Sequence, residues 1–192
     1  MQINDLIKIY DNAVDLKTIA KLIKYSDQLN FTDSKIGFGE GKVDKSIRDV
    51  QNYFLKNIPT SMTETFWFNY LGNLFTQFYH RYKNELKIDN SFFINGIYDI
   101  SILKYEVGGF YEPHIDHISS GSNKRDLSFI LFLNNDYKGG ELCFSGFDKT
   151  DKEICIEPKP GKLIVWPSYF MYPHGVKPVI EGKRFTVVGW SR

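Results

Sequence analysis

The second half of the chain is a series of short segments that glycine and proline interrupt. From about Ser91 onward the sequence is rich in aromatic and β-branched residues, a composition typical of strands. We expect strands at residues 97–105, 127–133, 140–144, 153–157, 162–166 and 184–190. Pairs such as Gly108-Gly109, Gly139-Gly140 and Pro160-Gly161 mark turns between them. Many short strands at this spacing favour an antiparallel barrel or sandwich.

The first half of the chain is predicted to be helical. Asp15 is placed to cap a helix whose apolar residues begin at Leu16 and recur at helical spacing. Ser46 is placed to cap a second helix, which would bury Ile47, Val50 and Phe54 and end before Pro59. The clearest helix begins near Thr63, and its apolar stripe is Trp67, Tyr70, Leu71, Leu74, Phe78 and Tyr82.

No linker separates the two halves, so we predict one α+β domain over residues 1–192. Its helical part would span about residues 1–90 and pack on one face of the sheet that residues from about 91 to 192 form. A length of 192 residues with 42% hydrophobic residues is enough for one such core.

Charge, hydropathy and cysteine content argue against several classes of protein. The formal net charge is +1, which argues against a protein that mainly grips nucleic-acid backbones. No apolar run approaches the roughly 18 residues of a membrane span, and charged residues throughout the N-terminus argue against a signal peptide. Cys143 and Cys155 form no CxxC motif and no disulfide framework. We therefore expect a reducing, cytoplasmic setting and no membrane partner.

A histidine and a carboxylate, His114 and Asp116, lie two residues apart just after an expected strand. Residues i and i+2 of an extended segment point the same way, so the two side chains would converge. His174, far downstream at the edge of another strand, could supply a third ligand. Two histidines and one carboxylate form the facial triad of non-haem Fe(II) oxygenases, which leaves positions open for dioxygen and a cosubstrate. The other histidines, His80 and His117, are not expected to be ligands.

Arg184 follows His174 by ten residues, at the start of the last expected strand. If Phe185 and Val187 face one side of that strand, Arg184 and Thr186 face the other. A guanidinium is always charged and can bind a carboxylate through two parallel hydrogen bonds. Because a buried arginine is costly unless it is paired, an inward Arg184 would indicate a bound anion. An arginine exposed at the strand end would carry no such meaning.

Five ordered motifs follow one another in the second half of the chain. They are Tyr105–Asp116, Arg125–Asn134, Gly139–Phe144, Pro158–Ser168 and Pro173–Trp190. Together they resemble the motifs of the 2-oxoglutarate and Fe(II)-dependent dioxygenases, and within them the prolyl 4-hydroxylase-like branch. The resemblance covers about residues 90–192 and implies a double-stranded β-helix, or jelly roll.

The resemblance also implies a role for each matching residue. The two histidines and the aspartate above would bind Fe(II). Arg184 would pair with the distal carboxylate of 2-oxoglutarate, and Tyr105 would offer a phenol to the same carboxylate. The residues that line the peptide site would be Tyr111, Arg125 and Trp190. Many prolyl 4-hydroxylases use lysine at the Arg184 position, whereas the oxygen-sensing branch uses arginine.

The activity that the resemblance implies is hydroxylation of a C–H bond, most simply peptidyl-prolyl 4-hydroxylation of the procollagen-proline 4-dioxygenase type. Dioxygen and 2-oxoglutarate would be consumed, succinate and CO2 released, and ascorbate would serve as reductant. The substrate would be a proline-containing peptide or protein.

Three alternatives remain open. The first is hydroxylation of a free amino acid or other small metabolite by the same iron centre. The second is nucleic-acid demethylation, but that branch has two arginines six residues apart in the last strand, whereas Arg184 and Arg192 are eight apart. The third is a non-catalytic scaffold, which the presence of every expected metal and cosubstrate residue disfavours.

Overall fold

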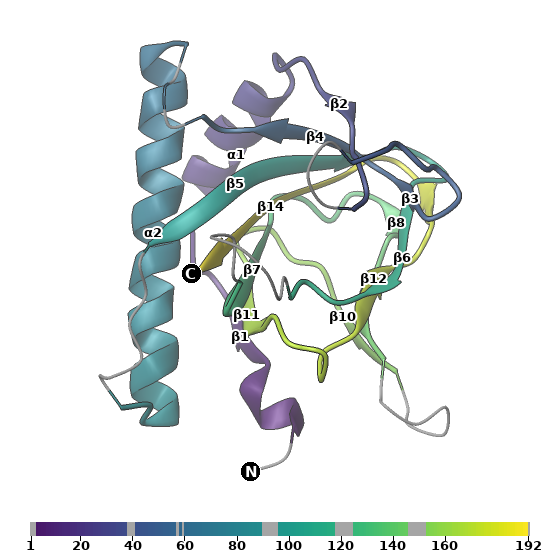
Figure 1. The fold of residues 1–192 in the computed structure, drawn as a ribbon. Coiled ribbons are helices and arrows are strands. Elements are labelled where there is room, and N and C mark those ends of the chain that lie inside the picture. Colours follow the sequence, from purple (N-terminus) through teal and green to yellow (C-terminus); the bar gives the residue numbers. More distant parts are fainter. Residues whose placement is uncertain are drawn as a thin grey trace.

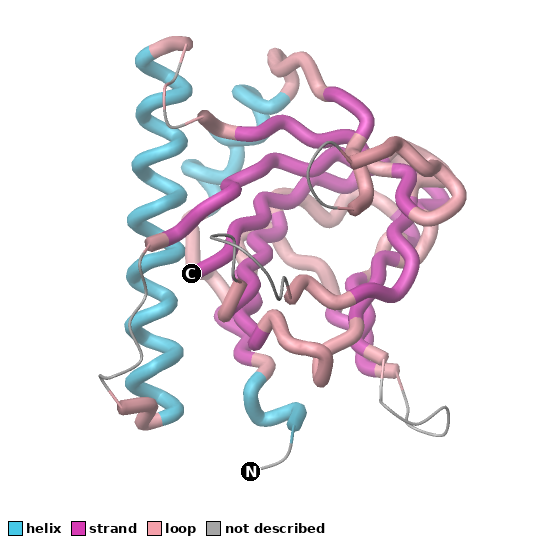
Figure 2. The backbone as a smooth tube through the Cα atoms, viewed as in Figure 1, coloured by secondary structure: helices cyan, strands magenta, loops and turns pink. Residues whose placement is uncertain are grey.

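The structure is a computed structural model that describes residues 3–37, 41–56, 58, 60–89, 96–117, 125–145 and 153–191. Two antiparallel sheets face each other, and two helices cover the outer face of the larger sheet (Figure 1). Figure 2 shows the same backbone with its helices and strands in different colours. This is the predicted α+β architecture, a double-stranded β-helix with the helices packed on one sheet.

The major sheet has seven strands in the order β1-β11-β7-β14-β5-β4-β2. The bounds of these strands are β1 Lys8–Tyr10, β2 Thr32–Asp33, β4 Gln51–Phe54, β5 Ile97–Tyr105, β7 Leu127–Phe132, β11 Leu163–Pro167 and β14 Arg184–Ser191. The minor sheet has five strands in the order β10-β9-β12-β6-β3. Its strands are β3 Arg48–Asp49, β6 Phe110–His114, β9 Leu142–Phe144, β10 Ile154–Ile156 and β12 His174–Val176. Two further strands pair with each other, β8 Lys138–Gly139 and β13 Val179–Glu181.

All six strands expected from the sequence are present, as β5, β7, β9, β10, β11 and β14. The first half of the chain, however, is not only helical. After the 3₁₀ turn Ile3–Leu6, strand β1 pairs with β11 along one edge of the major sheet. Strand β4 pairs with β5 on the other side of the same sheet. The N-terminal part therefore supplies both edges of the sheet whose central strands come from the second half of the chain.

Helices α1 (Leu16–Ser26) and α2 (Met62–Leu86) form the outer layer. Asp15 caps α1, as predicted, because its side chain accepts a hydrogen bond from the Thr18 N–H. Ser61 caps α2 in the same way, by accepting from the Glu64 N–H. Helix α2 has 25 residues, but among the described residues no helix combines the length and the apolar character that a membrane crossing requires.

The prediction of a second helix capped by Ser46 is wrong. Asp44 accepts hydrogen bonds from both the N–H and the hydroxyl of Ser46, which makes a turn in place of a helix start. The chain then continues as β3 and β4, which pair with β6 and β5. Val50 is buried as expected, but Ile47 and Phe54 are exposed. Pairing with existing sheet edges therefore overrides the local helical spacing.

Strand β14 separates two apolar cores. Its outward residues Phe185 and Val187 pack with the helices, whereas Val188 belongs to the core inside the barrel. Arg184 and Thr186 are fully buried, and the alternation along the strand turns them toward that interior. The alternation predicted from the sequence is therefore present. One face of β14 packs with the helices, and the other faces the interior of the barrel.

Gly189 on β14 is required by close packing against α2. A Cβ atom at this position would lie 2.8 Å from Cε2 of Phe75, a fully buried ring that stacks on Phe129. We expect Gly189→Ala to lower the free energy of unfolding by about 1–3 kcal/mol through overpacking, measured by chemical denaturation. Gly72→Ala is the matched control, because its Cβ would meet Ile100 only at 3.7 Å and alanine favours the helix by about 1 kcal/mol. Equal stability of the two variants would contradict this account.

The expectation that Cys143 and Cys155 form no disulfide framework is also wrong. Cys143 on β9 and Cys155 on β10 face each other in register and form a disulfide. The spacing of 12 residues carries no CxxC signal, and only the hairpin pairing of β9 with β10 brings the two side chains together. The disulfide joins the edge strand β10 of the minor sheet to its neighbour β9, which pairs with the strand that begins with His174.

Candidate metal centre and anion site

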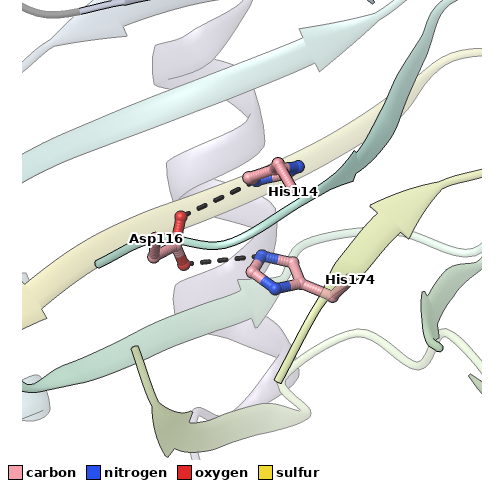
Figure 3. A group of neighbouring side chains, drawn as sticks. All are labelled: His114, Asp116 and His174. Carbon is pink, nitrogen blue, oxygen red and sulfur yellow. Dashed lines mark ion pairs between the residues drawn. The ribbon is translucent and has the colours of Figure 1, made fainter. Parts of the chain in front are cut away.

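His114, Asp116 and His174 converge inside the barrel, as the sequence predicted (Figure 3). His114 Nε2 lies 3.7 Å from Asp116 Oδ1, and His174 Nε2 lies 3.4 Å from Asp116 Oδ2. One ligand atom from each residue lies within 4.8 Å of the other two. This spacing suits three ligands of a single metal ion.

Strand pairing explains how residues 60 positions apart meet. His114 is the last residue of β6 and faces His174, the first residue of β12, in the antiparallel register. Each imidazole is oriented by its own backbone, since Nδ1 of His114 contacts the Glu112 carbonyl at 2.9 Å and Nδ1 of His174 contacts the Tyr172 carbonyl at 3.0 Å. With Nδ1–H donating to a carbonyl, each Nε2 keeps its lone pair for a metal.

The protonation states also favour metal binding. Burial and the neighbouring His174 lower the pKa of His114, which keeps this imidazole neutral. Burial alone would raise the pKa of Asp116, but His174, His114 and a hydrogen bond from Ser128 outweigh it and lower that pKa. The centre therefore combines a neutral imidazole at His114 with an ionised carboxylate, the states in which these groups act as ligands.

Two serines that sequence reasoning missed support the carboxylate. The Ser128 hydroxyl donates to Asp116 Oδ2 at 2.7 Å, and Ser168 Oγ lies 2.8 Å from Ser128 Oγ. Serine on a strand carries no sequence signal of such a role, and only the register of β7 beside the triad reveals it.

Arg184 is the largest fully buried side chain of the described residues, with no exposed surface. Its Nη1 donates to the Thr186 hydroxyl at 3.3 Å, but Nε and Nη2 have no hydrogen-bond partner among the described residues. A buried guanidinium with two unsatisfied nitrogens is unfavourable unless an anion pairs with it. The structure thus fulfils the condition set by the sequence, an arginine that faces inward.

Aromatic rings surround this guanidinium. The guanidinium carbon of Arg184 lies 4.7 Å from the ring centroid of Tyr105, on the neighbouring strand β5. It lies 5.4 Å from the ring centroid of Phe132. The Tyr137 hydroxyl, which sequence reasoning missed, is buried near Arg184 but not in hydrogen-bonding geometry. Burial raises the pKa of Tyr137 despite the opposing charge of Arg184, so its phenol stays neutral and can donate a hydrogen bond to an anion.

A cavity of about 620 Å³ opens onto the triad. It is lined by the three predicted ligands and by Tyr105, Tyr111, Arg125 and Trp190, so all these predicted site residues come together. Arg184 is not among the lining residues, but its guanidinium carbon lies 4.7 Å from the ring centroid of Tyr105, which does line the cavity. The apolar inner wall includes Leu142 and Trp166, both of them buried.

Two arginines at the cavity lie against aromatic rings. The guanidinium of Arg125 lies 3.7 Å from the Trp190 ring, and that of Arg48 lies 4.5 Å from the Tyr111 ring. Tyr111 in turn stacks on the candidate ligand His114 with ring centroids 3.6 Å apart. The Nε atoms of both arginines are buried without a hydrogen-bond partner among the described residues. Arg48 was not predicted, because its segment was assigned to a helix.

The remaining candidates lie away from the centre or beyond the described residues. His117 lines the cavity but stacks on Tyr169, and His80 is exposed on α2. Arg192, the second arginine of the demethylase comparison, lies outside the described residues.

A jelly roll holds two histidines and one carboxylate, together with a buried arginine whose Nε and Nη2 have no hydrogen-bond partner among the described residues. This combination fits the facial-triad oxygenase class of site. Residues 100–192, just under half of the chain, match the model of the 2OG-Fe(II) oxygenase superfamily. This match bears out the resemblance to the 2-oxoglutarate and Fe(II)-dependent dioxygenases that the sequence predicted.

Curated relatives match half of the chain or less. A PKHD-type hydroxylase of Prochlorococcus marinus (strain NATL1A) is 41% identical over 96 residues, which is 49% of this chain and 41% of the relative. Prolyl 3-hydroxylase 2 of Homo sapiens is 42% identical over 66 residues, 34% of this chain and 9% of that protein. The chain therefore spans less than half the length of these relatives.

Solved structures extend the likeness to nearly the whole chain. A Pseudomonas putida prolyl-4-hydroxylase has a TM-score of 0.71 at 20% identity, with 97% of this chain and 92% of that chain covered. A Trichoplax adhaerens prolyl hydroxylase, in complex with a peptide fragment of the hypoxia inducible factor oxygen degradation domain, has a TM-score of 0.75 at 19% identity, with 97% and 83% covered. At these identities the comparison shows a shared fold.

Proposed function

We propose that this protein is an Fe(II)- and 2-oxoglutarate-dependent dioxygenase that hydroxylates prolyl residues in a peptide or protein. The observation that carries the proposal is the combination, in one barrel, of the triad His114, Asp116 and His174 with the buried, unsatisfied guanidinium of Arg184. A metal centre alone would fit many reactions. The orphaned cation beside it supports an anionic cosubstrate.

Each residue of the site has a defined task in this proposal. The two Nε2 atoms and the Asp116 carboxylate would hold Fe(II), which supplies the activation of dioxygen that couples decarboxylation of 2-oxoglutarate to C–H hydroxylation. Arg184 would bind the distal carboxylate of 2-oxoglutarate through Nε and Nη2, and the phenol of Tyr105 would serve the same carboxylate. The buried ring of Trp166 beside His174 would help to exclude water from the reacting atoms.

A prolyl substrate is supported by the outer part of the cavity. The rings of Tyr111 and Trp190 suit the preformed polyproline II conformation of proline-rich segments. The Nε of Arg125, which has no hydrogen-bond partner among the described residues, would donate to a peptide carbonyl and so hold the proline ring near the metal. One solved neighbour contains a bound peptide fragment. Because the curated relatives include a prolyl 3-hydroxylase, oxidation at C3 is an alternative to the predicted oxidation at C4.

The test compares three acceptors with protein loaded with Fe(II) and 2-oxoglutarate. We expect a proline-rich peptide to accelerate succinate formation and to gain one oxygen atom in mass spectrometry, because flanking backbone contacts position the reacting carbon. Free proline lacks those contacts and should react poorly, and a methylated oligonucleotide should not react. If only free proline gained oxygen, the small-metabolite alternative would replace the peptide proposal. Product analysis then separates C3 from C4.

Further predictions accompany this proposal. Ascorbate as reductant, a cytoplasmic location, the absence of nucleic-acid and membrane partners, and a single domain over residues 1–192 stay predictions. The common core between the helices and the major sheet supports the single domain.

A further inference from the structure

The carboxylate of Asp116 lies at the end of a chain of two buried hydroxyls. Ser128 on β7 contacts Asp116 Oδ2 at 2.7 Å, and Ser168, just past the end of β11, contacts Ser128 at 2.8 Å. Both serines are only 1% exposed. These two hydrogen bonds connect Asp116 to the major sheet, which supplies none of the three candidate ligands.

The direction of the two hydrogen bonds follows from counting protons. A serine hydroxyl has one proton to donate, and an ionised carboxylate can only accept. Because Ser128 gives its proton to Asp116, its oxygen must accept from Ser168 in the second bond. The donors therefore run from Ser168 through Ser128 to Asp116, and each bond strengthens the next in a site shielded from water.

We propose that Ser128 and Ser168 are positioning residues that fix how Asp116 coordinates the metal. The inference rests on the proposed Fe(II) centre. Ser128 occupies Oδ2, which holds the carboxylate plane in one rotation and disfavours coordination through both oxygens. A facial triad needs this, because a carboxylate bound through both oxygens would fill one of the three positions reserved for cosubstrate and dioxygen.

The decisive experiment compares two variants of nearly equal shape, Ser128→Thr and Ser128→Val. Threonine keeps the hydroxyl, and valine replaces it with a methyl group. We expect Ser128→Thr to bind Co(II), a spectroscopic substitute for Fe(II), about as tightly as the original protein. Ser128→Val should bind Co(II) about 10- to 100-fold more weakly, the usual effect of losing a partner that orients a metal ligand. The visible spectrum of bound Co(II) should change in the valine variant alone, since it reports coordination number and geometry.

The second serine tests the relay itself. Ser168→Ala should weaken Co(II) binding less than Ser128→Val, because it acts through Ser128. Added to Ser128→Val, it should cause no further loss, since the path to Asp116 is already broken. Ser168 lies one step from the carboxylate, so this variant also serves if Ser128→Val fails to fold, as thermal unfolding would reveal.

The outcomes separate this inference from the proposed function. If the original protein binds no Co(II), both fail. If it binds Co(II) and the valine and threonine variants bind equally well with the same spectrum, only the positioning role is overturned. Additive losses in Ser128→Val and Ser168→Ala would overturn the relay.

Discussion

Replacing His174 with alanine is expected to abolish turnover and to weaken Fe(II) binding by more than a hundredfold. Partners that only orient a metal ligand already contribute about 10- to 100-fold in metal affinity or activity, so removal of a ligand should exceed that range. His174 is 5% exposed and its Nδ1 is held by the Tyr172 carbonyl, so no solvent-exposed side chain can substitute for it. Titration with Fe(II) without oxygen, and succinate formation with oxygen, measure the two effects.

The matched control is His80→Ala, which removes an exposed imidazole on α2. It should leave metal affinity and turnover unchanged. Full activity of the His174→Ala variant would remove this histidine from the site and, with it, the facial-triad assignment.

Replacing Arg184 with methionine should affect cosubstrate binding and stability in opposite directions. Truncating one partner of a buried charge pair costs about 2–5 kcal/mol, so 2-oxoglutarate affinity should fall by about 30- to several-thousand-fold. Without 2-oxoglutarate, the variant should unfold at an equal or higher temperature than the original protein, because an unpaired buried charge is replaced by an apolar side chain. Adding 2-oxoglutarate should raise the melting temperature of the original protein but not of the variant.

Two further variants sharpen this test. Arg184→Lys keeps a cation but loses the planar fork, so it should retain part of the affinity. Lys183→Ala changes the adjacent, exposed cation and should have no effect on 2-oxoglutarate affinity. If the Arg184→Met variant binds 2-oxoglutarate with unchanged affinity while the Lys183→Ala variant loses that affinity, the anion site has been assigned to the wrong residue.

The strand pattern and the convergence of His114 with Asp116 could be predicted because their signals are local. His114 and Asp116 are two residues apart, so the strand period alone brings them together. The alternation of Arg184 with Phe185 predicted correctly which side chain turns inward. His174 is different, since its distance along the chain gives no pairing. It was a candidate third ligand from its place at a strand edge, and the resemblance to known motifs then strengthened that assignment.

Other features depend on contacts that the sequence does not encode locally. The segment after Ser46 has apolar residues at helical spacing, yet open sheet edges offered by β5 and β6 recruit it as strands. Cys143 and Cys155 meet only through the register of β9 and β10. Ser128 and Tyr137 belong to residue types that are common everywhere, and only their burial beside a charged group distinguishes them.

The placement of the tryptophans gives the protein a built-in optical reporter. Trp166 meets the His174 ring nearly edge-on at a centroid distance of 5.0 Å, and Trp190 lies at the cavity on the guanidinium of Arg125. Trp67 is buried in the helical layer against Tyr25, in the other core. A paramagnetic ion at the triad would therefore quench the emission of Trp166 strongly and that of Trp67 weakly. Occupancy of the centre can thus be followed in unlabelled protein by intrinsic fluorescence, with Trp67 as the internal reference.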